Sequence, residues 1–559
     1  MGVAVFLRAV GGKGRCFLLM LLMLPAVVGV GAVNQVSAQP PTPGEVGDTM
    51  RPTVDINTLM EQPPPAVPLT PPPPVAPPPA DEKRVRVNHF EFSGNSLFSD
   101  AELQEVVKEF AGQDLTLADI YQVADRLSDF FQEQGYNLTT ATVPAQRMRG
   151  GVLRLEIVEG KVGKVLFSGN RRYSAEYLAA QVAPVRPGTI VRFADLERQV
   201  LLLNDLPGLV ARSVMLPGAD FGTTDLQLTV EENPVAASVT VDNHGREVVG
   251  KWRVATDVTF NNPLEYGDVL GLGYTHSQSG LLRQGRINYG LPLGTDGWRL
   301  NMNYARAEYD VGKEFSRLNI SGISETARVQ ITSPQIRSRR TNLNWVVGGA
   351  RVRGSSDIDN ISLSDDTIVY LEAGLNVSHR HDHGGSSTFS TLVATNFRSN
   401  EEGDDNKALP PRVEIRGSYE HPFAGVWSVL VKGEAVWAAD PMPDSNKYSL
   451  GGPASVRGFV SSMERGDQGG MGSLELRRLF VLEPLTLQAR AFVDAGVVNS
   501  RSVRGFKSSS KNLKSAGFGL TTFAAGRYLV DAVWAKPIGG DASGEERSSQ
   551  LWVTLSAMF

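Results

Sequence analysis

Hydrophobic and polar residues alternate one by one over much of the C-terminal part of this chain. From Leu485 to Ala495, apolar side chains occupy the odd positions, and most even positions are polar, including Gln488, Arg490 and Asp494. A β-strand directs successive side chains to opposite faces, so this segment predicts a strand with one apolar and one mostly polar face. In a membrane barrel the apolar face contacts lipid and the polar face lines the lumen.

Sixteen such segments follow one another between residues 234 and 559, separated alternately by short turns and longer loops. An even number of strands brings both ends of a single-chain barrel to the same side of the membrane. We therefore predict a 16-stranded antiparallel outer-membrane β-barrel over residues 234–559. Its strands are predicted to start near Ala236, Trp252, Val269, Leu282, Trp298, Thr326, Asn342, Thr367, Thr388, Arg412, Trp427, Met471, Leu485, Ala516, Arg527 and Gln550.

An internal repeat precedes the predicted barrel. The tetrapeptide Phe-Ser-Gly-Asn occurs at residues 92–95 and again at 167–170, and each copy follows an alternating strand. Each copy also precedes apolar residues at helical spacing, and then further strands. This order predicts two α+β domains, at residues 84–159 and 161–232. The residues that mark the repeat are Phe92, Gly94, Asn95, Phe167, Gly169 and Asn170.

The composition of the first 83 residues indicates that they do not contribute to a packed core. Residues 1–38 have the pattern of a secretory signal peptide, with basic residues, an apolar run at 17–30 and small residues at 36–38. Residues 39–83 are rich in proline, which favours an extended polyproline segment. Within them, residues 54–62 have a weak helical pattern, and an unstructured segment is the alternative because so short a helix is marginal.

Composition excludes several classes of function. The single cysteine, Cys16, lies in the signal segment, so the processed chain has neither a disulfide nor a thiol nucleophile. The net charge of -5 gives no basic surface for nucleic acid. After the signal segment, no apolar stretch has the length of a membrane helix, so a membrane protein with this sequence is a barrel. No nucleotide-binding or nucleophile motif occurs, and we predict no enzyme, no catalytic residue and no cofactor.

His379, His381 and His383, together with Asp382, form the one cluster of metal-binding residue types. Metal-binding histidines converge on one point and are oriented by further hydrogen bonds. Short turns between strands, in contrast, are commonly built from solvated polar residues. We interpret the cluster as a solvated periplasmic turn and predict no metal site, although the sequence leaves metal binding open.

Two short motifs of the predicted barrel carry a resemblance to a known family. The first is Ser-Val-Arg-Gly-Phe at 455–459, in the Gly-rich sixth long loop, and the second is Phe-x-Asp-x-Gly at 492–496, on the thirteenth strand. Their order and spacing resemble the signature pair of the two-partner secretion transporters, the haemolysin-activator and filamentous-haemagglutinin-transporter group. The resemblance runs from Val85 onward and includes residues 204–208, 242–245 and 466–469 together with Glu475.

The resemblance implies that the sixth loop folds back into the barrel and meets the polar face of the thirteenth strand. A guanidinium fork suits a carboxylate, so Arg457 and Asp494 are expected to form a lock that fixes this loop. Inside a wet pore such a pair is screened, and we expect it to contribute about 1 kcal/mol. The alternative is that both side chains are solvated. The motif residues are Val456, Arg457, Gly458 and Phe459 on the loop and Phe492, Asp494 and Gly496 on the strand.

The resemblance also implies a function. It places two POTRA domains in the periplasm of a Gram-negative bacterium, below a barrel in the outer-membrane lipid. The implied partner is a secreted exoprotein, such as a β-helical adhesin or haemolysin, which is exported unfolded without ATP. The terminal Phe559 is an aromatic signal of the kind that barrel-assembly machinery reads, and residues 54–62 are a candidate plug helix.

Two other functions remain possible at this point. A barrel-assembly insertase of the same superfamily usually carries more POTRA domains than this chain provides. A passive porin has neither a POTRA repeat nor an arginine-bearing loop motif. The sequence leaves the identity of the exoprotein and the oligomeric state open.

Overall fold

The computed structural model describes residues 41–48, 83–401, 404–405, 411–501, 508–541 and 548–559. The predicted signal peptide and the candidate helix at 54–62 lie outside these residues. A helix long and apolar enough to cross a membrane is not found in the described part of the chain.

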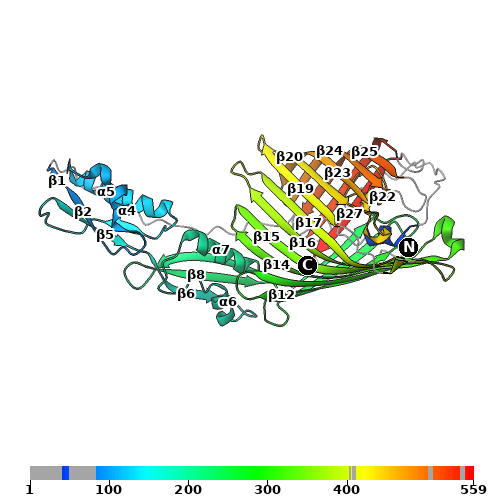
Figure 1. Ribbon diagram of the computed structural model, residues 1–559, viewed down its shortest axis with the longest axis horizontal. Coiled ribbons are helices and arrows are strands. Elements are labelled where there is room, and N and C mark those ends of the chain that lie inside the picture. The colour runs from blue at the N-terminus through cyan, green and yellow to red at the C-terminus, as the bar shows by residue number, and fades with distance from the viewer. Residues whose placement is uncertain (1–40, 49–82, 402–403, 406–410, 502–507, 542–547) are drawn as a thin grey trace. The chain divides into compact units, whose positions relative to one another are not determined.

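Sixteen antiparallel strands close into a barrel in which each strand pairs with its neighbours in the sequence, as the alternation predicted (Figure 1). A two-residue strand, β18 (Asp404–Asp405), only extends the hairpin of β17. The barrel strands are β9 (Val235–Asp242), β10 (Arg253–Asn261), β11 (Val269–Ser277), β12 (Leu282–Leu293), β13 (Trp298–Asp310), β14 (Ile320–Arg337), β15 (Thr341–Ile358), β16 (Ile361–Arg380), β17 (Ser386–Glu401), β19 (Arg412–Phe423), β20 (Trp427–Ala438), β23 (Gln468–Leu482), β24 (Leu485–Ser500), β25 (Ser509–Ala524), β26 (Tyr528–Gly540) and β27 (Gln550–Met558).

Three strands begin well before their predicted starts, and the reason is visible in β16. Its first residues, 361–366, read Ile-Ser-Leu-Ser-Asp-Asp, and they pair with the end of β15 far from the apolar band. The side chains of residues 361–366 are exposed or half-buried there, and strand pairing continues where lipid no longer imposes an apolar face. The strands that start early are β14, at Ile320 in place of Thr326, β16, at Ile361 in place of Thr367, and β25, at Ser509 in place of Ala516.

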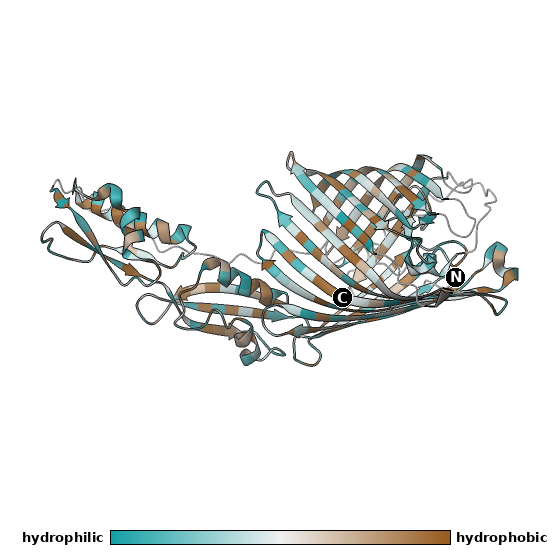
Figure 2. Ribbon diagram, in the orientation of Figure 1, coloured by the Kyte–Doolittle hydropathy of each residue, from teal (hydrophilic) through white to brown (hydrophobic). Residues whose placement is uncertain are grey.

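Side chains of the barrel alternate between the lumen and the outer surface. On β20, Val431 and Trp437 are exposed on the outer face, whereas Lys432 and Glu434 lie on the opposite face. Figure 2 shows the same alternation as repeated changes of hydropathy along the strands. The lumen is therefore polar, and the outer surface carries the apolar band that lipid requires.

Two α/β domains precede the barrel and share one topology. In each, the first strand pairs in parallel with the last, and the remaining strand pairs with the last in antiparallel fashion. The first contains β2 (His89–Ser93), α4 (Asp100–Val106), α5 (Leu117–Glu133), β4 (Thr140–Thr142) and β5 (Val152–Val158), with a small sheet of β1 (Val85–Val87) and β3 (Gln113–Leu115) and a 3-10 turn, η3 (Lys108–Phe110). The second contains β6 (Lys161–Ser168), α6 (Ala175–Gln181), α7 (Phe193–Asn204), β7 (Leu209–Pro217) and β8 (Thr223–Glu232).

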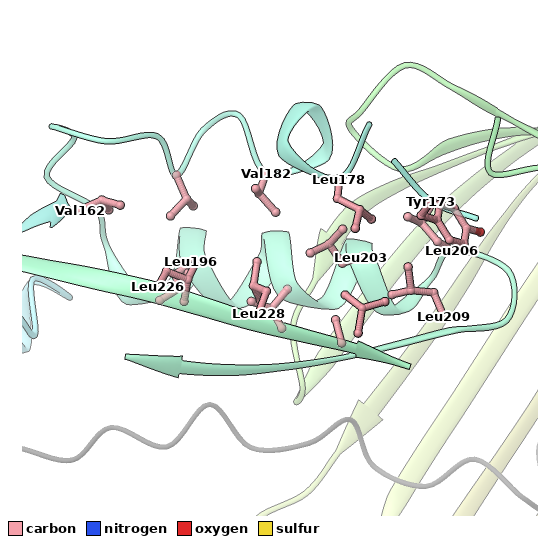
Figure 3. Packing of buried hydrophobic residues seen from close by; sticks show 14 residues of the cluster. Val162, Tyr173, Leu178, Val182, Leu196, Leu203, Leu206, Leu209, Leu226 and Leu228 are labelled. Carbon is pink, nitrogen blue, oxygen red and sulfur yellow. The ribbon is translucent and has the colours of Figure 1, made fainter. Parts of the chain in front are cut away.

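The core of the second domain lies between its helices and one face of its sheet (Figure 3). Leu178 of α6 and Leu203 of α7 are fully buried with Leu228 of β8. The first domain has an equivalent core, in which Leu127 and Phe131 of α5 are fully buried. Burial of apolar side chains on this scale is the dominant favourable contribution to the folding of such small domains.

The repeated tetrapeptide forms the same turn in both domains. Gly94 and Gly169 have positive φ angles of 80° and 86°, which favour glycine. A Cβ atom at either position would lie 2.3 Å from a carbonyl oxygen, that of Ile157 or of Val230. The side-chain amide of Asn95 donates to the carbonyl of Phe98 at 2.5 Å, and that of Asn170 donates to the carbonyl of Tyr173 at 2.9 Å. The repeat therefore fixes where each first strand ends and has a structural role.

Short elements lie at the end of the barrel opposite the start of β9. Helix α2 (Pro43–Asp48) contacts the ends of β13, β14 and β15, where Val46 packs against lumen-facing side chains such as Tyr309. The other short elements are η4 (Lys313–Leu318), η5 (Asp444–Asn446), β21 (Tyr448–Leu450) and β22 (Glu464–Gly466). The last three belong to the segment between β20 and β23, which is called loop six below.

Candidate functional site

Loop six folds back into the lumen and buries its arginine. The hairpin of β21 and β22 closes the base of the loop. Beyond it, the amide of Gly452 donates to the carbonyl of Phe459 at 3.0 Å, and the amide of Phe459 donates to Val456 at 3.2 Å. This tight turn carries Arg457, which is 3% exposed.

Arg457 and Asp494 form a bidentate, buried pair. The Arg457 Nε donates to Asp494 Oδ2 at 3.0 Å, and Nη2 donates to Oδ1 at 2.6 Å. The main-chain amide of Arg457 also donates to Asp494 Oδ2, at 3.1 Å. Because the carboxylate binds both the side chain and the backbone of one residue, it fixes the position of the loop as well as the direction of the guanidinium.

Strand β23 supplies further acceptors for the same guanidinium. Its Nη1 donates to Glu475 Oε1 at 2.6 Å, and Nη2 donates to Ser473 Oγ at 2.8 Å. The ring of Phe492 lies 3.3 Å from the guanidinium carbon, a cation–π contact. In the strand register Ser473 faces Asp494 and Glu475 faces Phe492, so two neighbouring strands present all four side chains to the lumen.

The Asp494 carboxylate has two more donors. Ser473 Oγ lies 2.8 Å from Oδ1, and Ser515 Oγ of β25 lies 3.1 Å from Oδ2. The indole Nε1 of Trp552, on the last strand, donates to the carbonyl of Arg457 at 2.8 Å. Loop six is therefore held by four strands, β23, β24, β25 and β27.

The expectation of a screened, weak pair is wrong. Arg457, Glu475 and Asp494 are all nearly inaccessible to water, so the charges interact in a medium of low effective dielectric constant. Their desolvation is offset only because each charged group has several hydrogen-bond partners. Removing one partner from such a buried pair costs about 3–5 kcal/mol, because the other charge stays buried without compensation.

Glycines of both motifs allow the loop to approach the barrel wall. A Cβ atom at Gly458 would lie 2.6 Å from the Cβ of Ser515 and 2.9 Å from the nitrogen of Pro537. A Cβ atom at Gly496 would lie 2.4 Å from Leu450 of loop six. The two apolar motif residues, Val456 and Phe459, are buried in one cluster with Tyr448, Leu450, Met471 and Leu513.

Loop one, between β9 and β10, contacts loop six next to the place where the first strand, β9, pairs with the last strand, β27. The Asn243 side chain donates to the carbonyl of Leu551 at 2.7 Å and accepts from the amide of Val553 at 2.8 Å. The hydroxyl of Ser461, on loop six, donates to the carbonyl of His244 at 3.0 Å. Asn243 thus continues the pairing of the first and last strands and brings loop one against loop six.

Sequence reasoning missed several of these residues. Ser473, Ser515 and Trp552 were not predicted, and Glu475 appeared only as part of the resemblance. Arg490, placed beside Asp494 by strand parity, instead pairs with Asp531 at 2.7 Å. Strand parity could have indicated Ser473 and Glu475, which share one face of β23. The terminal Phe559 pairs through its backbone with Ala237, with its amide 2.8 Å from that carbonyl.

Comparison with known proteins agrees with this geometry. The family model described as haemolysin secretion/activation protein ShlB/FhaC/HecB matches residues 222–522, which is more than half of the chain. The chain belongs to the ShlB/FhaC/HecB family. A second model, the ShlB-type POTRA domain, matches residues 85–160 and identifies the first α/β domain.

Curated relatives of the same family match most of the chain. The heme/hemopexin transporter protein HuxB of Haemophilus influenzae (strain 86-028NP) is 24% identical over 477 residues, covering 82% of this chain and 84% of HuxB. The outer membrane transporter CdiB of Dickeya dadantii (strain 3937) is 25% identical over 472 residues, covering 81% of each chain. The structure of CdiB from Escherichia coli has the same fold, with a TM-score of 0.77 at 22% identity, over 94% of this chain and 100% of that chain.

These findings establish the class of protein. The chain is an outer-membrane transporter of two-partner secretion, its POTRA domain faces the periplasm, and the family acts with secreted partner exoproteins. The insertase and the porin are not favoured. The family is one of transporters, and nothing in the comparisons indicates an enzymatic activity.

Proposed function

We propose that this transporter recognises an adhesin-like or haemolysin-like exoprotein in its unfolded state and exports it through the barrel without ATP. In this proposal the two α/β domains, at 84–159 and 161–232, are POTRA domains that receive the client, and residues 234–559 form the pore. Arg457 and Asp494 hold loop six in the position that transport requires. The observation that carries the proposal is the burial of Arg457 among two carboxylates inside the lumen.

The sheet of the second α/β domain offers the client both an edge and an apolar surface. Strand β7 lies at one edge of the three-stranded sheet, where it pairs with β8 alone. Its outward side chains Val210, Val214 and Leu216 are exposed, although they are large and apolar. An extended peptide that pairs with such an edge gains main-chain hydrogen bonds and places alternate side chains against the apolar row.

The lumen provides a polar route beneath loop six. A cavity of about 440 Å³ is lined by residues of β15, β16, β17, β19 and β20 and by Ala454 of loop six. Its lining mixes polar residues, with Asn376, Ser378, Thr388, Arg416 and Lys432 among the contributors, and the apolar residues Val377, Phe389 and Met471. An extended chain passing along this wall would meet hydrogen-bonding side chains from five neighbouring strands.

The driving force in this proposal comes from the client. The sequence carries no nucleotide-binding motif, so the chain itself has no means to couple transport to hydrolysis. A client that folds on the far side leaves the pool of unfolded chains, and this shifts the transport equilibrium outward. In the same proposal, barrel-assembly machinery inserts the chain into the lipid by reading the terminal strand and Phe559.

The Pro-rich N-terminal segment is proposed to tether a plug. Helix α2 is docked in the lumen by contacts to loops one and six: Glu45 forms an ion pair with Arg246, and the amide of Gly44 donates to Asp444 at 3.1 Å. The candidate helix at 54–62 follows it along the same segment. A plug in this position closes the pore at rest and leaves it when the client enters.

Deletion of residues 84–232 tests the proposed function directly. Export of the exoprotein encoded beside the transporter is expected to stop, while the barrel still inserts and conducts ions. Photo-crosslinkers at Val214 and Leu216 of the full chain are expected to trap the N-terminal region of that exoprotein. Continued export by the deletion variant, or equal trapping of an unrelated unfolded protein, would show that the proposal is wrong.

A further inference from the structure

Strand β23 carries an arginine on the face that meets lipid. Its lumen face includes the buried Glu475, so the alternate residues Leu474 and Leu476 point outward, where they are 49% and 41% exposed. Arg478 continues this outward row and is itself exposed. The row ends at Leu482, which is 59% exposed. The arginine therefore interrupts a row of outward side chains that is apolar on both sides of it.

Two aromatic rings hold the guanidinium of Arg478. Its central carbon lies 5.0 Å from the ring centroid of Trp427 and 4.7 Å from that of Phe480. Trp427, the first residue of β20, is the direct partner of Arg478 in the strand register, and Phe480 is the next outward residue of β23. A cation is attracted to the negative face of an aromatic ring, so these two rings fix where the guanidinium lies.

The rings leave the donors of the guanidinium free. Among the residues that the structure describes, none accepts a hydrogen bond from the Arg478 side chain, and no carboxylate forms an ion pair with it. The indole N–H of Trp427 also has no acceptor in the described part of the chain. Arg306, an outward arginine near the opposite end of the barrel, is in contrast paired with Glu325 at 2.6 Å. The site of Arg478 thus presents N–H donors of two side chains without an acceptor.

The arginine lies toward the periplasmic end of the outer surface. Its partner Trp427 follows directly after the short turn at 424–426, which joins β19 to β20 at the same end of the barrel as the start of β9. Phe423, just before this turn, pairs with Trp427 and is 41% exposed. Aromatic residues concentrate at the membrane interface. A lipid-facing arginine is costly in the hydrocarbon core but tolerated at this depth, where its charge reaches the headgroups.

We propose that Arg478 and Trp427 bind the phosphate group of an anionic phospholipid in the periplasmic leaflet of the membrane. The guanidinium presents its donors as a planar fork that matches the oxygens of a phosphate, and the adjacent indole N–H supplies a further donor. From Arg478, the outward residues Leu476 and Leu474 lead toward the middle of the apolar band. The acyl chains of the same lipid lie along this row.

The local charge favours an anionic headgroup over a zwitterionic one. Phosphatidylethanolamine has the same phosphate, but it carries an ammonium group beside it. No carboxylate within the described ranges is paired with Arg478 to receive this ammonium group, and the guanidinium itself repels it. Phosphatidylglycerol carries no cation, so the arginine is expected to prefer it.

A lipid bound here contacts the two strands that carry loop six. Trp427 belongs to β20 and Arg478 to β23, which precede and follow that loop in the sequence. On the other side of β23, Arg478 faces Ala489 of β24, whose small side chain does not cover the guanidinium. The site lies on the outer surface, whereas Arg457 is buried in the lumen, so lipid binding can be measured independently of transport.

Native mass spectrometry of the full chain in detergent micelles tests the proposal. Delipidated protein is titrated with phosphatidylglycerol, phosphatidylethanolamine and inorganic phosphate, and we expect one phosphatidylglycerol per chain to be retained in preference. Arg478→Gln is expected to weaken its binding at least about tenfold, because hydrogen bonds between charged groups are lost. Arg478→Lys, which keeps the charge but not the fork, is expected to recover only part of the affinity. The matched control is Arg351→Gln, which removes an exposed, outward arginine farther from the periplasmic end, on β15.

Retention of heat-modifiable mobility by each variant shows that its barrel is folded. Unchanged affinity for phosphatidylglycerol in Arg478→Gln would overturn the proposal and would show that the arginine is only solvated. An equal loss in Arg351→Gln would also overturn it, since binding would then follow the overall charge. Equal affinity for phosphatidylethanolamine, or inorganic phosphate that phosphatidylglycerol does not displace, would exclude an anionic lipid headgroup as the ligand.

Discussion

The indole nitrogen of Trp552 donates a hydrogen bond to the main-chain carbonyl of Arg457 at 2.8 Å, and so joins the last strand of the barrel to loop six. The contact is buried, and it lies beside the seam where β27 meets β9. Loop six therefore depends on correct closure of the barrel as well as on the ion pair.

Trp552→Phe is expected to weaken the docking of loop six without unfolding the barrel. The substitution keeps an aromatic ring but leaves a buried carbonyl without its donor, which costs about 1–3 kcal/mol. We expect secretion to fall several-fold and loop six to become more sensitive to external protease. Trp534→Phe, on the outer face, is the matched control and is expected to secrete normally. Equal behaviour of the two variants would exclude a role for the hydrogen bond.

Gly94→Ala is expected to destabilise the first POTRA domain more than Gly112→Ala does. Both glycines have positive φ, so both substitutions carry backbone strain. At Gly94 the new Cβ would also lie 2.3 Å from the Ile157 carbonyl oxygen, whereas at Gly112 it would meet no atom within 4 Å. Thermal unfolding of the two variants measures the difference in their stability. Equal melting temperatures would contradict a destabilising contact between the new Cβ atom at position 94 and the Ile157 carbonyl.

Gly44→Ala is expected to release helix α2 and to raise the single-channel conductance. A Cβ atom at Gly44 would lie 2.4 Å from the carbonyl oxygen of Asp444, so the helix cannot stay docked in its present position. Gly285→Ala is the matched control, since a Cβ there meets no atom within 4 Å. Conductance that stays at the wild-type value in Gly44→Ala would show that α2 does not obstruct the pore.

Stability is expected to fall on acidification because of His244. Burial, which disfavours the imidazolium, lowers the pKa of His244 to about 4 from an ordinary value of 6.5. The folded protein therefore favours the neutral ring, and this contribution is complete above pH 6.5 and is lost as the pH falls toward 4. The full loss is roughly 3 kcal/mol.

Thermal melts of wild type and His244→Gln, from about one pH unit above the ordinary His pKa of 6.5 down to about pH 4, measure this contribution. We expect the glutamine variant to have a lower melting temperature at neutral pH and a flatter decline on acidification. Parallel declines in the two proteins would show that another group is responsible.

The sequence predicted the barrel well because one physical rule repeats along it. Lipid on one side and water on the other impose a period of two, as in β20 and β24, and the same parity placed Asp494 on the lumen face. Where that constraint ends, as in the first residues of β16, the predicted strand starts were late. The lumen-facing position of Asp494 could be predicted because the alternation that predicted its strand also assigned each residue to a face.

Contacts between segments that are distant in the sequence could not be predicted from local patterns. Trp552 meets Arg457 only after the last strand has paired with the first, and Trp427 meets Arg478 only through the pairing of β20 with β23. Helix α2 contains Pro43, Gly44 and Gly47 in six residues, a composition that disfavours an isolated helix. Its structure comes from docking in the lumen, which local periodicity does not indicate.

The central claim is that Arg457 and Asp494 act as one unit that positions loop six for transport. A double-mutant cycle of Arg457→Ala and Asp494→Asn, read out as the amount of exoprotein secreted by correctly inserted barrels, tests it most directly. We predict that each single variant lowers secretion at least tenfold, that the double variant is no worse than the singles, and that Arg457→Lys rescues only weakly because it lacks the planar fork. Silent single variants, or effects that multiply independently in the double variant, would contradict the account.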